Sequence, residues 1–372
     1  MGFSRDIETI ESVVCKGDPA FERVPKSRLD QALVALKSYT NDTDKDGFLL
    51  TAMTVVALAG NGHSRLIPNA AISVVPRRIV IRDGQPVLVE DGRAHRIFAV
   101  DSVPYEQLLA AWSGLLAGNV ARCRVLSGIM LAWPAALQWA GVGRGENIRY
   151  HLETGAERSF SLQDVVPALP LYPVAETGAV DPRLDDHGLS GGSILEMRFA
   201  AWWWRIADLK ALDVAQVTRS VSQMSEQPGA NVVIDLRGNP GGSFLKAIPL
   251  IDWLRTQWRG TRCAVLVNAY TFSASIVTAA LLTHRLGSRA QLIGSDMGDD
   301  LAFFAEGGTI VLQDSGAYLR HSTAHHDWEN GQVATSTPPE IADHMVTAGP
   351  LHVMQTMRAK QEQAALTFVR EG

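Results

Sequence analysis

Two apolar segments that each end in small residues constrain this chain most. The first, Asn231–Gly242, reads Asn-Val-Val-Ile-Asp-Leu-Arg-Gly-Asn-Pro-Gly-Gly, and the second, Val265–Ser275, contains Ser273 in its small-residue end. Each segment predicts a buried strand followed by a turn that opens a helix. Turns of this kind place backbone N–H groups beside a hydroxyl, an arrangement that suits acyl transfer.

The composition favours an ordered protein with a sizeable core. The chain has 372 residues, of which 46% are hydrophobic and 20% charged. This length predicts two or three domains. Lys and Arg total 34 against 39 Asp and Glu, a formal charge of −5. A nucleic-acid-binding surface needs a basic patch, so the charge balance argues against that class of function.

The start of the sequence and its cysteines bear on location. The residues after Met1 lack the apolar core of a signal peptide, and no apolar run reaches the length of a membrane span. Cys15, Cys123 and Cys263 are odd in number and widely spaced, which fits a reducing compartment. We expect a cytoplasmic protein without a membrane span, or a periplasmic one if a leader was removed.

The N-terminal half divides into two predicted domains and a linker. Residues 1–70 form a helical domain, with helices around Leu29–Leu36 and over Phe48–Leu58. Residues 71–165 form a mixed module, in which an Asp83-Gly84 turn joins two strands and a helix covers Tyr105–Leu116. Residues 166–192 are rich in Pro, Asp and Gly and predict a linker.

Residues 193–372 alternate strands with helices, which predicts a parallel sheet covered on both faces. The predicted strands are Ile194–Phe199, Val232–Leu236, Cys263–Val267, Ala290–Ile293 and Thr309–Leu312. The predicted helices are Leu212–Glu226, Leu245–Trp258, Ser275–Leu286 and Met345–Gln363. Pro249 lies inside the second of these helices and predicts a kink or a late helix start.

Asp235-Leu-Arg-Gly-Asn-Pro-Gly-Gly242 and Thr271-Phe-Ser-Ala-Ser275 together resemble the signature pair of the tail-specific, or carboxyl-terminal processing, serine peptidases. The resemblance extends over most of the chain, because Asn61-Gly-His-Ser64, the middle module and Asp327-Trp-Glu-Asn-Gly331 follow in family order. It implies an α/β core of the ClpP/crotonase fold, preceded by a helical domain and a PDZ-like module.

The resemblance makes Ser273 the nucleophile, at a helix N-terminus whose dipole favours a developing anion. The backbone N–H of Ala274 and that of Gly241 or Gly242 are the candidate oxyanion donors. The alternative is purely structural: the glycines form only a turn, and Ser273 caps a helix.

The general base departs from the best-known branch, which uses a lysine in the Gly-rich turn after the next strand. That turn, Gly294–Asp300, contains no lysine. The chain is closer to the branch resembling the tricorn protease core, in which His63 matches the base and Glu329 the carboxylate that supports it. Asp327 is an alternative to Glu329, and Lys246 is a rival base.

Three other signals do not indicate a separate function. Asp42–Gly47 has the opening spacing of a calcium loop, but Met53 occupies the position of its last ligand, so we interpret it as a helix-capping turn. His321, His325 and His326 lack a second set of ligands for zinc. The run Ala201–Trp204 follows a predicted strand and forms either a wall of the substrate cleft or a packed edge.

We therefore expect a serine peptidase that cleaves peptide or protein substrates through an acyl-enzyme and needs no metal or organic cofactor. One alternative is a lapsed family member that binds a peptide or an apolar ligand. A crotonase-like acyl-thioester enzyme is a weaker one, which the Asn239–Gly242 turn and the Ser273 segment disfavour. Residues 72–162 show no clear carboxylate-binding glycine loop, which leaves recognition of substrate tails open.

Overall fold

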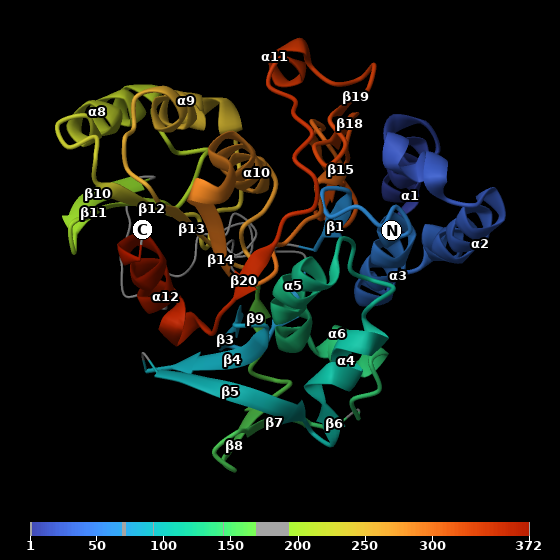
Figure 1. Cartoon of the computed structure of the whole chain (residues 1–372). Helices are drawn as coiled ribbons and strands as arrows, with labels where there is room; N and C mark the ends of the chain where they lie inside the picture. Colours follow the sequence, from blue (N-terminus) through green and yellow to red (C-terminus); the bar gives the residue numbers. More distant parts are fainter. Residues whose placement is uncertain (1, 69–71, 92, 144, 169–192, 372) are drawn as a thin grey trace. The chain divides into compact units, whose positions relative to one another are not determined.

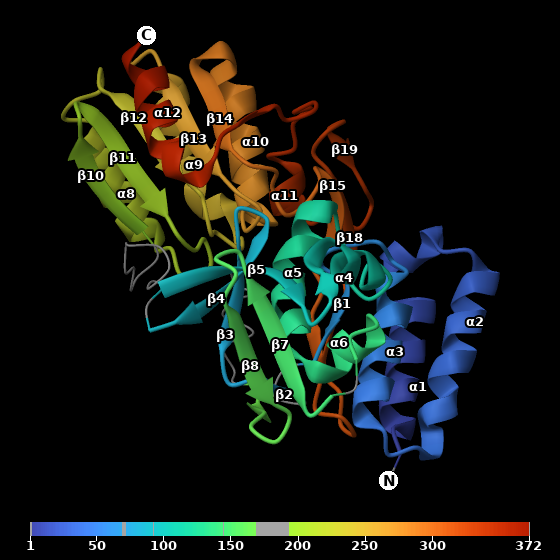
Figure 2. The ribbon, with the colours of Figure 1, turned by 90° about the horizontal axis from the view of Figure 1, so that it is seen from below.

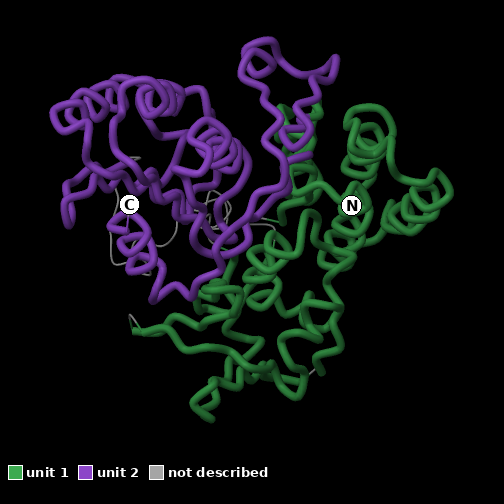
Figure 3. The backbone as a smooth tube through the Cα atoms, in the orientation of Figure 1, with its two compact units in different colours: residues 1–173, 303–325 green, residues 174–302, 326–372 purple. Residues whose placement is uncertain are grey.

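A computed structural model describes residues 2–371 except 69–71, 92, 144 and 169–192. The chain divides into two compact units, shown in Figure 3. Unit 1 comprises residues 1–173 and 303–325, and unit 2 comprises residues 174–302 and 326–372. Most of the predicted linker lies outside the described residues. The sequence-based division differs at residues 303–325, which it placed with the C-terminal core.

Unit 1 begins with helices that match the predicted helical section (Figure 1). They are α1 (Ser4–Ser12), α2 (Lys26–Lys37) and α3 (Lys45–Ala57). Asp44 caps α3 by accepting the N–H of Gly47 at 3.0 Å. The acidic segment Asp42–Gly47 therefore starts a helix, as predicted, although α3 begins three residues before Phe48.

The middle of unit 1 is an antiparallel sheet in the order β3-β4-β5-β7-β8, accompanied by short strands and helices. Asp83 and Gly84, with φ of 52° and 71°, join β3 to β4, which confirms the predicted turn. The helix predicted to reach Leu116 ends at Ala111. The elements are β2 (Ser73–Val74), β3 (Arg78–Arg82), β4 (Gln85–Glu90), β5 (Arg93–Val100), β6 (Val103–Pro104), α4 (Tyr105–Ala111), α5 (Val120–Ala132), α6 (Pro134–Trp139), β7 (Asn147–Leu152), β8 (Glu157–Ser161) and β9 (Val166–Pro167).

The predicted strand Thr309–Leu312 forms, but it is not part of the parallel sheet. It is β16 (Thr309–Val311), and it pairs with β17 (Tyr318–Arg320), which in turn pairs with β1 (Arg65–Ile67). Leu312 and Leu319 belong to the hydrophobic core that the helical section and the middle module share. The chain crosses from unit 2 to unit 1 within β15 (Ala302–Ala305) and returns to unit 2 within β18 (Ala324–Asp327).

Unit 2 is built on a six-stranded sheet in the order β10-β11-β12-β13-β14-β20. All neighbouring strands are parallel except β10 and β11, which confirms the predicted parallel sheet. The run Ala201–Trp204 follows a strand, as predicted, but it is also the start of a further, buried strand, β11, that we did not predict. The strands are β10 (Ser193–Arg198), β11 (Ala201–Ile206), β12 (Asn231–Asp235), β13 (Cys263–Val267), β14 (Ala290–Gly294) and β20 (Val353–Gln355).

Helices cover both faces of this sheet. Figure 1 shows α8 (Val214–Met224), α9 (Ile248–Thr256) and α10 (Ala274–Leu286) on one face and α12 (Arg358–Arg370) on the other. Figure 2 shows α12 lying along the central strands, where Ala365, Leu366 and Val369 join a buried cluster. Pro249 occupies the first turn of α9, which is the late helix start that the sequence predicted.

The helix predicted over Met345–Gln363 is wrong in its first half. Gly349, with φ of 67°, and Pro350 interrupt the helical pattern. The following residues pair as β20 with β14, and the helix starts only at Arg358. Unit 2 also contains β19 (Gln332–Val333) and the short α11 (Pro339–Ala342). Among the described residues, the helices are too short or too polar to cross a bilayer.

The turn between β10 and β11 offers a stability test. Phe199 and Ala200 form its two-residue loop with φ of 54° and 63°. The Asp83-Gly84 turn has similar positive φ values, but there the residues are Asp and Gly, which favour such turns. We expect Ala200→Gly to raise the free energy of unfolding by about 0.5–1 kcal/mol, measured by urea denaturation. Ala211→Gly, at an exposed position without positive φ, is the control and is expected not to stabilise.

Candidate active site

Asn239 shapes the turn that follows β12. Its side chain is fully buried, and its Nδ2 donates to the carbonyl of Ile206 at 2.8 Å. Its Oδ1 accepts the N–H of Gly241 at 2.9 Å. The Gly241 N–H is therefore already used within the turn, which corrects its inclusion among the oxyanion donors.

Both glycines of the turn are required by close approach. Gly241 has φ of 104°, and a Cβ on it would lie 2.8 Å from Ser273 Cβ and 3.0 Å from the backbone nitrogen of Ala274. Gly242 has φ of 128°, and a Cβ there would collide with the backbone of Lys210. Only glycine combines this backbone with such contacts, so the turn lies directly against the Ser273 segment.

Ser273 has an unusual backbone at the start of α10. Its φ of 56° and ψ of −128° are strained for a residue with a side chain, at a cost of about 1–3 kcal/mol. Its hydroxyl makes no capping hydrogen bond to the helix. The structural alternative, in which Ser273 is an ordinary helix cap, does not account for this conformation.

Hydrogen bonds join the two signature segments. The N–H of Phe272 donates to the carbonyl of Asn239 at 3.0 Å. The hydroxyl of Thr271 donates to the carbonyl of Leu236 at 2.9 Å, and Asn268 Oδ1 accepts the N–H of Gly238 at 3.0 Å. The parallel pairing of β12 with β13 brings the ends of both strands to the same edge, which is where these bonds form.

Two N–H groups in the signature segments remain available to a ligand. Within the described chain, the backbone N–H groups of Gly242 and Ala274 donate no hydrogen bond. Ala274 is the first helical residue, whose N–H has no acceptor within its own helix. The site thus offers a hydroxyl and donors that suit an oxyanion.

The lysine-free turn and the rival base Lys246 both make contacts of their own. The Gly294–Asp300 turn lies against the signature segment, with Gly298 N–H donating to the carbonyl of Thr271 at 2.9 Å. Asp296 in that turn accepts a hydrogen bond from the side-chain amide of Gln355 at 2.6 Å. Lys246 donates through Nζ to the carbonyl of Lys210 at 2.7 Å.

His63 lies in unit 1, in the loop after α3. It is 6% exposed, and its ring stacks on Phe303 at 5.2 Å between centroids with 18° between planes. Asn61 fixes the same loop, because its Nδ2 lies within 3.1 Å of both Ser64 Oγ and the Phe304 carbonyl. The loop therefore holds an imidazole in a defined orientation within its unit.

The two carboxylates near Trp328 differ in what they contact. Asp327 is buried and accepts both the backbone and side-chain N–H groups of Asn330, each at about 3.0 Å, so it stabilises its own turn. Glu329 is half-buried and lies in unit 2, as Ser273 does. The preceding residue, Trp328, packs edge-on against Phe244, with 5.2 Å between ring centroids. Phe244 lies two residues after Gly242.

In the histidine cluster, His325 contacts neighbouring side chains of unit 1. His325 lies 3.1 Å from a guanidinium nitrogen of Arg23 and packs on the ring of Phe304. In the part of the chain that the structure describes, there is no group of three or more potential metal ligands. The contacts of His325 are therefore those of a packed side chain.

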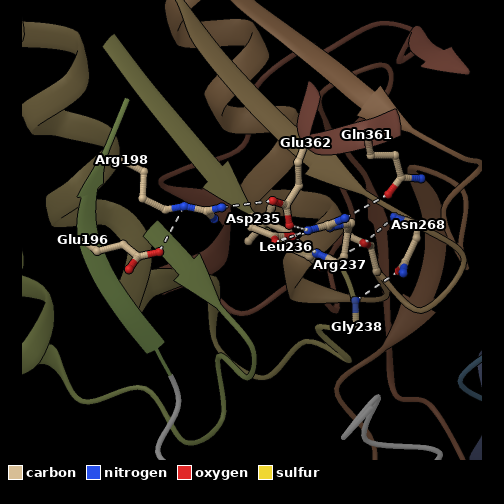
Figure 4. Close-up of polar contacts among 10 residues, drawn as sticks. Glu196, Arg198, Asp235, Leu236, Arg237, Gly238, Asn268, Gln361 and Glu362 are labelled. Atoms are coloured by element: carbon tan, nitrogen blue, oxygen red, sulfur yellow. Dashed lines mark hydrogen bonds and ion pairs between the residues drawn. The ribbon is translucent and has the colours of Figure 1, made fainter. Parts of the chain in front are cut away.

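Ion pairs connect Arg237, in the segment that leads into the glycine turn, to Asp235 and to α12. Figure 4 shows Arg237 bound to Asp235 at 2.7 Å and to Glu362 of α12 at 3.3 Å, with Arg198 also bound to Glu362. Burial alone would raise the pKa of Asp235, but the adjacent Arg237 guanidinium holds that pKa below its ordinary value. Asp235 is therefore ionised and paired where β12 ends.

Comparisons with known proteins show similarity in structure only. No protein-family model matches the chain, and no curated protein matches it. The structure of mature CPAF complexed with lactacystin has a TM-score of 0.54 at 12% identity, covering 86% of this chain and 89% of that chain. A CPAF mutant with serine replaced by alanine has a TM-score of 0.55 at 11% identity, covering 98% and 95%.

A putative S41 protease from Bacteroides fragilis is also similar, with a TM-score of 0.43 at 13% identity, covering 98% of this chain and 97% of that chain. The two CPAF comparisons span most of this chain with TM-scores above 0.5. The chain therefore has the fold of the CPAF structures, and the resemblance to the tail-specific peptidases that the two signature segments indicated is confirmed at the level of the fold.

Proposed function

We propose that this protein is a serine peptidase that cleaves peptide or protein substrates through an acyl-enzyme. The observation that carries the proposal is the strained backbone of Ser273, at a helix start where its hydroxyl makes no cap and Gly241 approaches closely. Strained residues of this kind occur where a nucleophile is held exposed between a strand and a helix. CPAF-like folds supply an independent reason to favour peptidase chemistry.

In the proposed mechanism, Ser273 Oγ attacks the scissile carbonyl while His63 accepts its proton. The N–H groups of Ala274 and Gly242 bind the oxyanion, and Gly241 provides the space in which the carbonyl approaches. His63 then protonates the leaving amine, and water hydrolyses the acyl-enzyme through the same groups. Glu329 orients His63. We favour Glu329 over Asp327 for this role because Asn330 already occupies the Asp327 carboxylate.

We further propose that unit 2 is a ClpP/crotonase-like core and that residues 71–165 form a PDZ-like module. The parallel sheet with helices on both faces supports the first assignment. The antiparallel sheet of unit 1 and its family-like position in the sequence support the second. A module of that kind would present substrate chains to the core by strand addition.

A fluorophosphonate probe tests the activity. We expect it to label the wild-type protein and not Ser273→Ala, because only an activated serine reacts with it. His63→Ala is expected to slow labelling about 10²–10⁴-fold through loss of the base. Labelling is quantified by mass spectrometry, with circular dichroism as the control for folding. Undiminished labelling of His63→Ala would exclude His63 as the base, and a folded wild type that is not labelled would favour a binding protein.

A further inference from the structure

Ser273 is kept from the conformation that serine ordinarily takes at a helix start. There, an extended backbone lets the hydroxyl accept the N–H of the second or third helical residue, here Ser275 or Ile276. In this protein those N–H groups donate elsewhere, to the carbonyl of Phe272 at 3.2 Å and to the carbonyl of Ser273 at 2.9 Å. Something outside Ser273 must therefore hold its positive φ.

The hydroxyl of Ser275 contacts Phe272, the residue that precedes Ser273. Ser275 is fully buried, and its Oγ accepts the N–H of Phe272 at 2.9 Å, which also donates to the Asn239 carbonyl at 3.0 Å. The same Oγ lies 2.7 Å from the Phe272 carbonyl and 2.8 Å from the Asn239 carbonyl, either of which accepts its proton. Because Phe272 precedes Ser273 and Ser275 follows it, one hydroxyl fixes the residues on both sides of the proposed nucleophile.

We propose that Ser275 is a positioning residue for Ser273. Its hydroxyl holds the Phe272 peptide group against the Asn239 carbonyl, and so keeps Ser273 strained, with Oγ out of the helix cap. Without it, Ser273 is free to turn to an extended backbone and become an ordinary cap, which withdraws the hydroxyl from substrate. The catalytic consequence rests on the proposed function, whereas the conformational one does not.

Thr278 supplies a matched control one turn further along α10. It is also fully buried, and its Oγ1 donates to the carbonyl of Ala274 at 2.9 Å. That bond stays within the helix and does not involve the segment before Ser273. Ser275→Ala and Thr278→Val each remove one buried hydroxyl from the same helix, and only the first removes the constraint on Ser273.

The first experiment measures the rate of fluorophosphonate labelling together with Tm. We expect Ser275→Ala to slow labelling about 100-fold or more, because small misplacements of reacting groups have effects of that size. Ser275→Cys, which keeps a weak donor and acceptor, is expected to be intermediate, and Thr278→Val to label at the wild-type rate. Equal rates in Ser275→Ala and wild type, or equal losses in Ser275→Ala and Thr278→Val, would overturn the proposal.

The second experiment is a crystal structure of the Ser275→Ala variant, which needs no activity. We expect residue 273 to adopt negative φ, with its Oγ accepting the N–H of residue 275 or Ile276. Retention of φ near +56° would overturn the proposal even where labelling falls. Absence of labelling in the folded wild type would instead refute the proposed function, and the crystal structure would still decide the role of Ser275.

Discussion

Gly241→Ala is expected to lose labelling by a fluorophosphonate probe almost completely, by about 10³-fold or more. A Cβ at this position lies 2.8 Å from both Ser273 Cβ and the Phe272 carbonyl oxygen, so the signature segments must separate. The φ of 104° adds backbone strain of about 1–3 kcal/mol for any residue with a side chain. Removing oxyanion donors from their position costs about 10²–10³ in rate, and displacement of the nucleophile adds to that loss.

Gly287→Ala is the control that separates backbone strain at positive φ from the steric contact of an added Cβ. Gly287 ends α10 with φ of 56°, and a Cβ there meets nothing within 4 Å. We expect it to lower stability by about 1 kcal/mol and to leave the labelling rate per folded molecule unchanged. A similar loss of labelling in both variants, or full labelling of Gly241→Ala, would contradict the close contact between Gly241 and Ser273.

Asp235→Ala is expected to reduce the free energy of unfolding by about 3–5 kcal/mol, because it leaves the largely buried Arg237 without its main partner. The side chains of this pair are 7% and 14% exposed, so water compensates little for the missing carboxylate. Urea denaturation measures the loss. Asp252→Ala is the matched control, since its pair with Arg255 is about half exposed and such pairs contribute about 0–1 kcal/mol.

The contribution of Asp235 is also expected to depend on pH. Its folded pKa lies below its unfolded pKa of about 3.9, so the stabilisation is complete above that unfolded value. It is lost as the pH falls through the folded pKa. The stability difference between wild type and Asp235→Ala should therefore be constant near neutral pH and shrink below about pH 4. A difference that instead grows at low pH would show that the Asp235 carboxylate is not the paired group.

The core of unit 2 was predictable because its signals are local. Continuous apolar runs such as Val232–Leu236 and Cys263–Val267 have the pattern of strands buried on both faces, and both formed. The pair of signature segments likewise indicated a glycine turn beside a serine. Buried β11 was missed because its three consecutive tryptophans lack the alternation expected of a strand.

The errors arose where pairing between distant segments decided the structure. Thr309–Leu312 has the pattern of a strand, but which strand it joins depends on β17, and the sequence pattern does not identify that partner. The Met345–Gln363 pattern was helical overall, yet Gly349-Pro350 and the free edge of β14 favoured a short strand instead. Edge pairing of this kind depends on neighbours that lie far away in the sequence.

The sequence by itself determined the residue types of the candidate site: Ser273 in a small-residue segment, the glycines that accept positive φ, and a turn without lysine. These follow from local chemistry, since side-chain size and backbone freedom belong to each residue. Only the tertiary structure decided that Asn239 occupies the Gly241 N–H and that Ser275 brackets Ser273. The reason is physical: buried hydrogen-bonding groups take whichever partners the packed strands bring within reach.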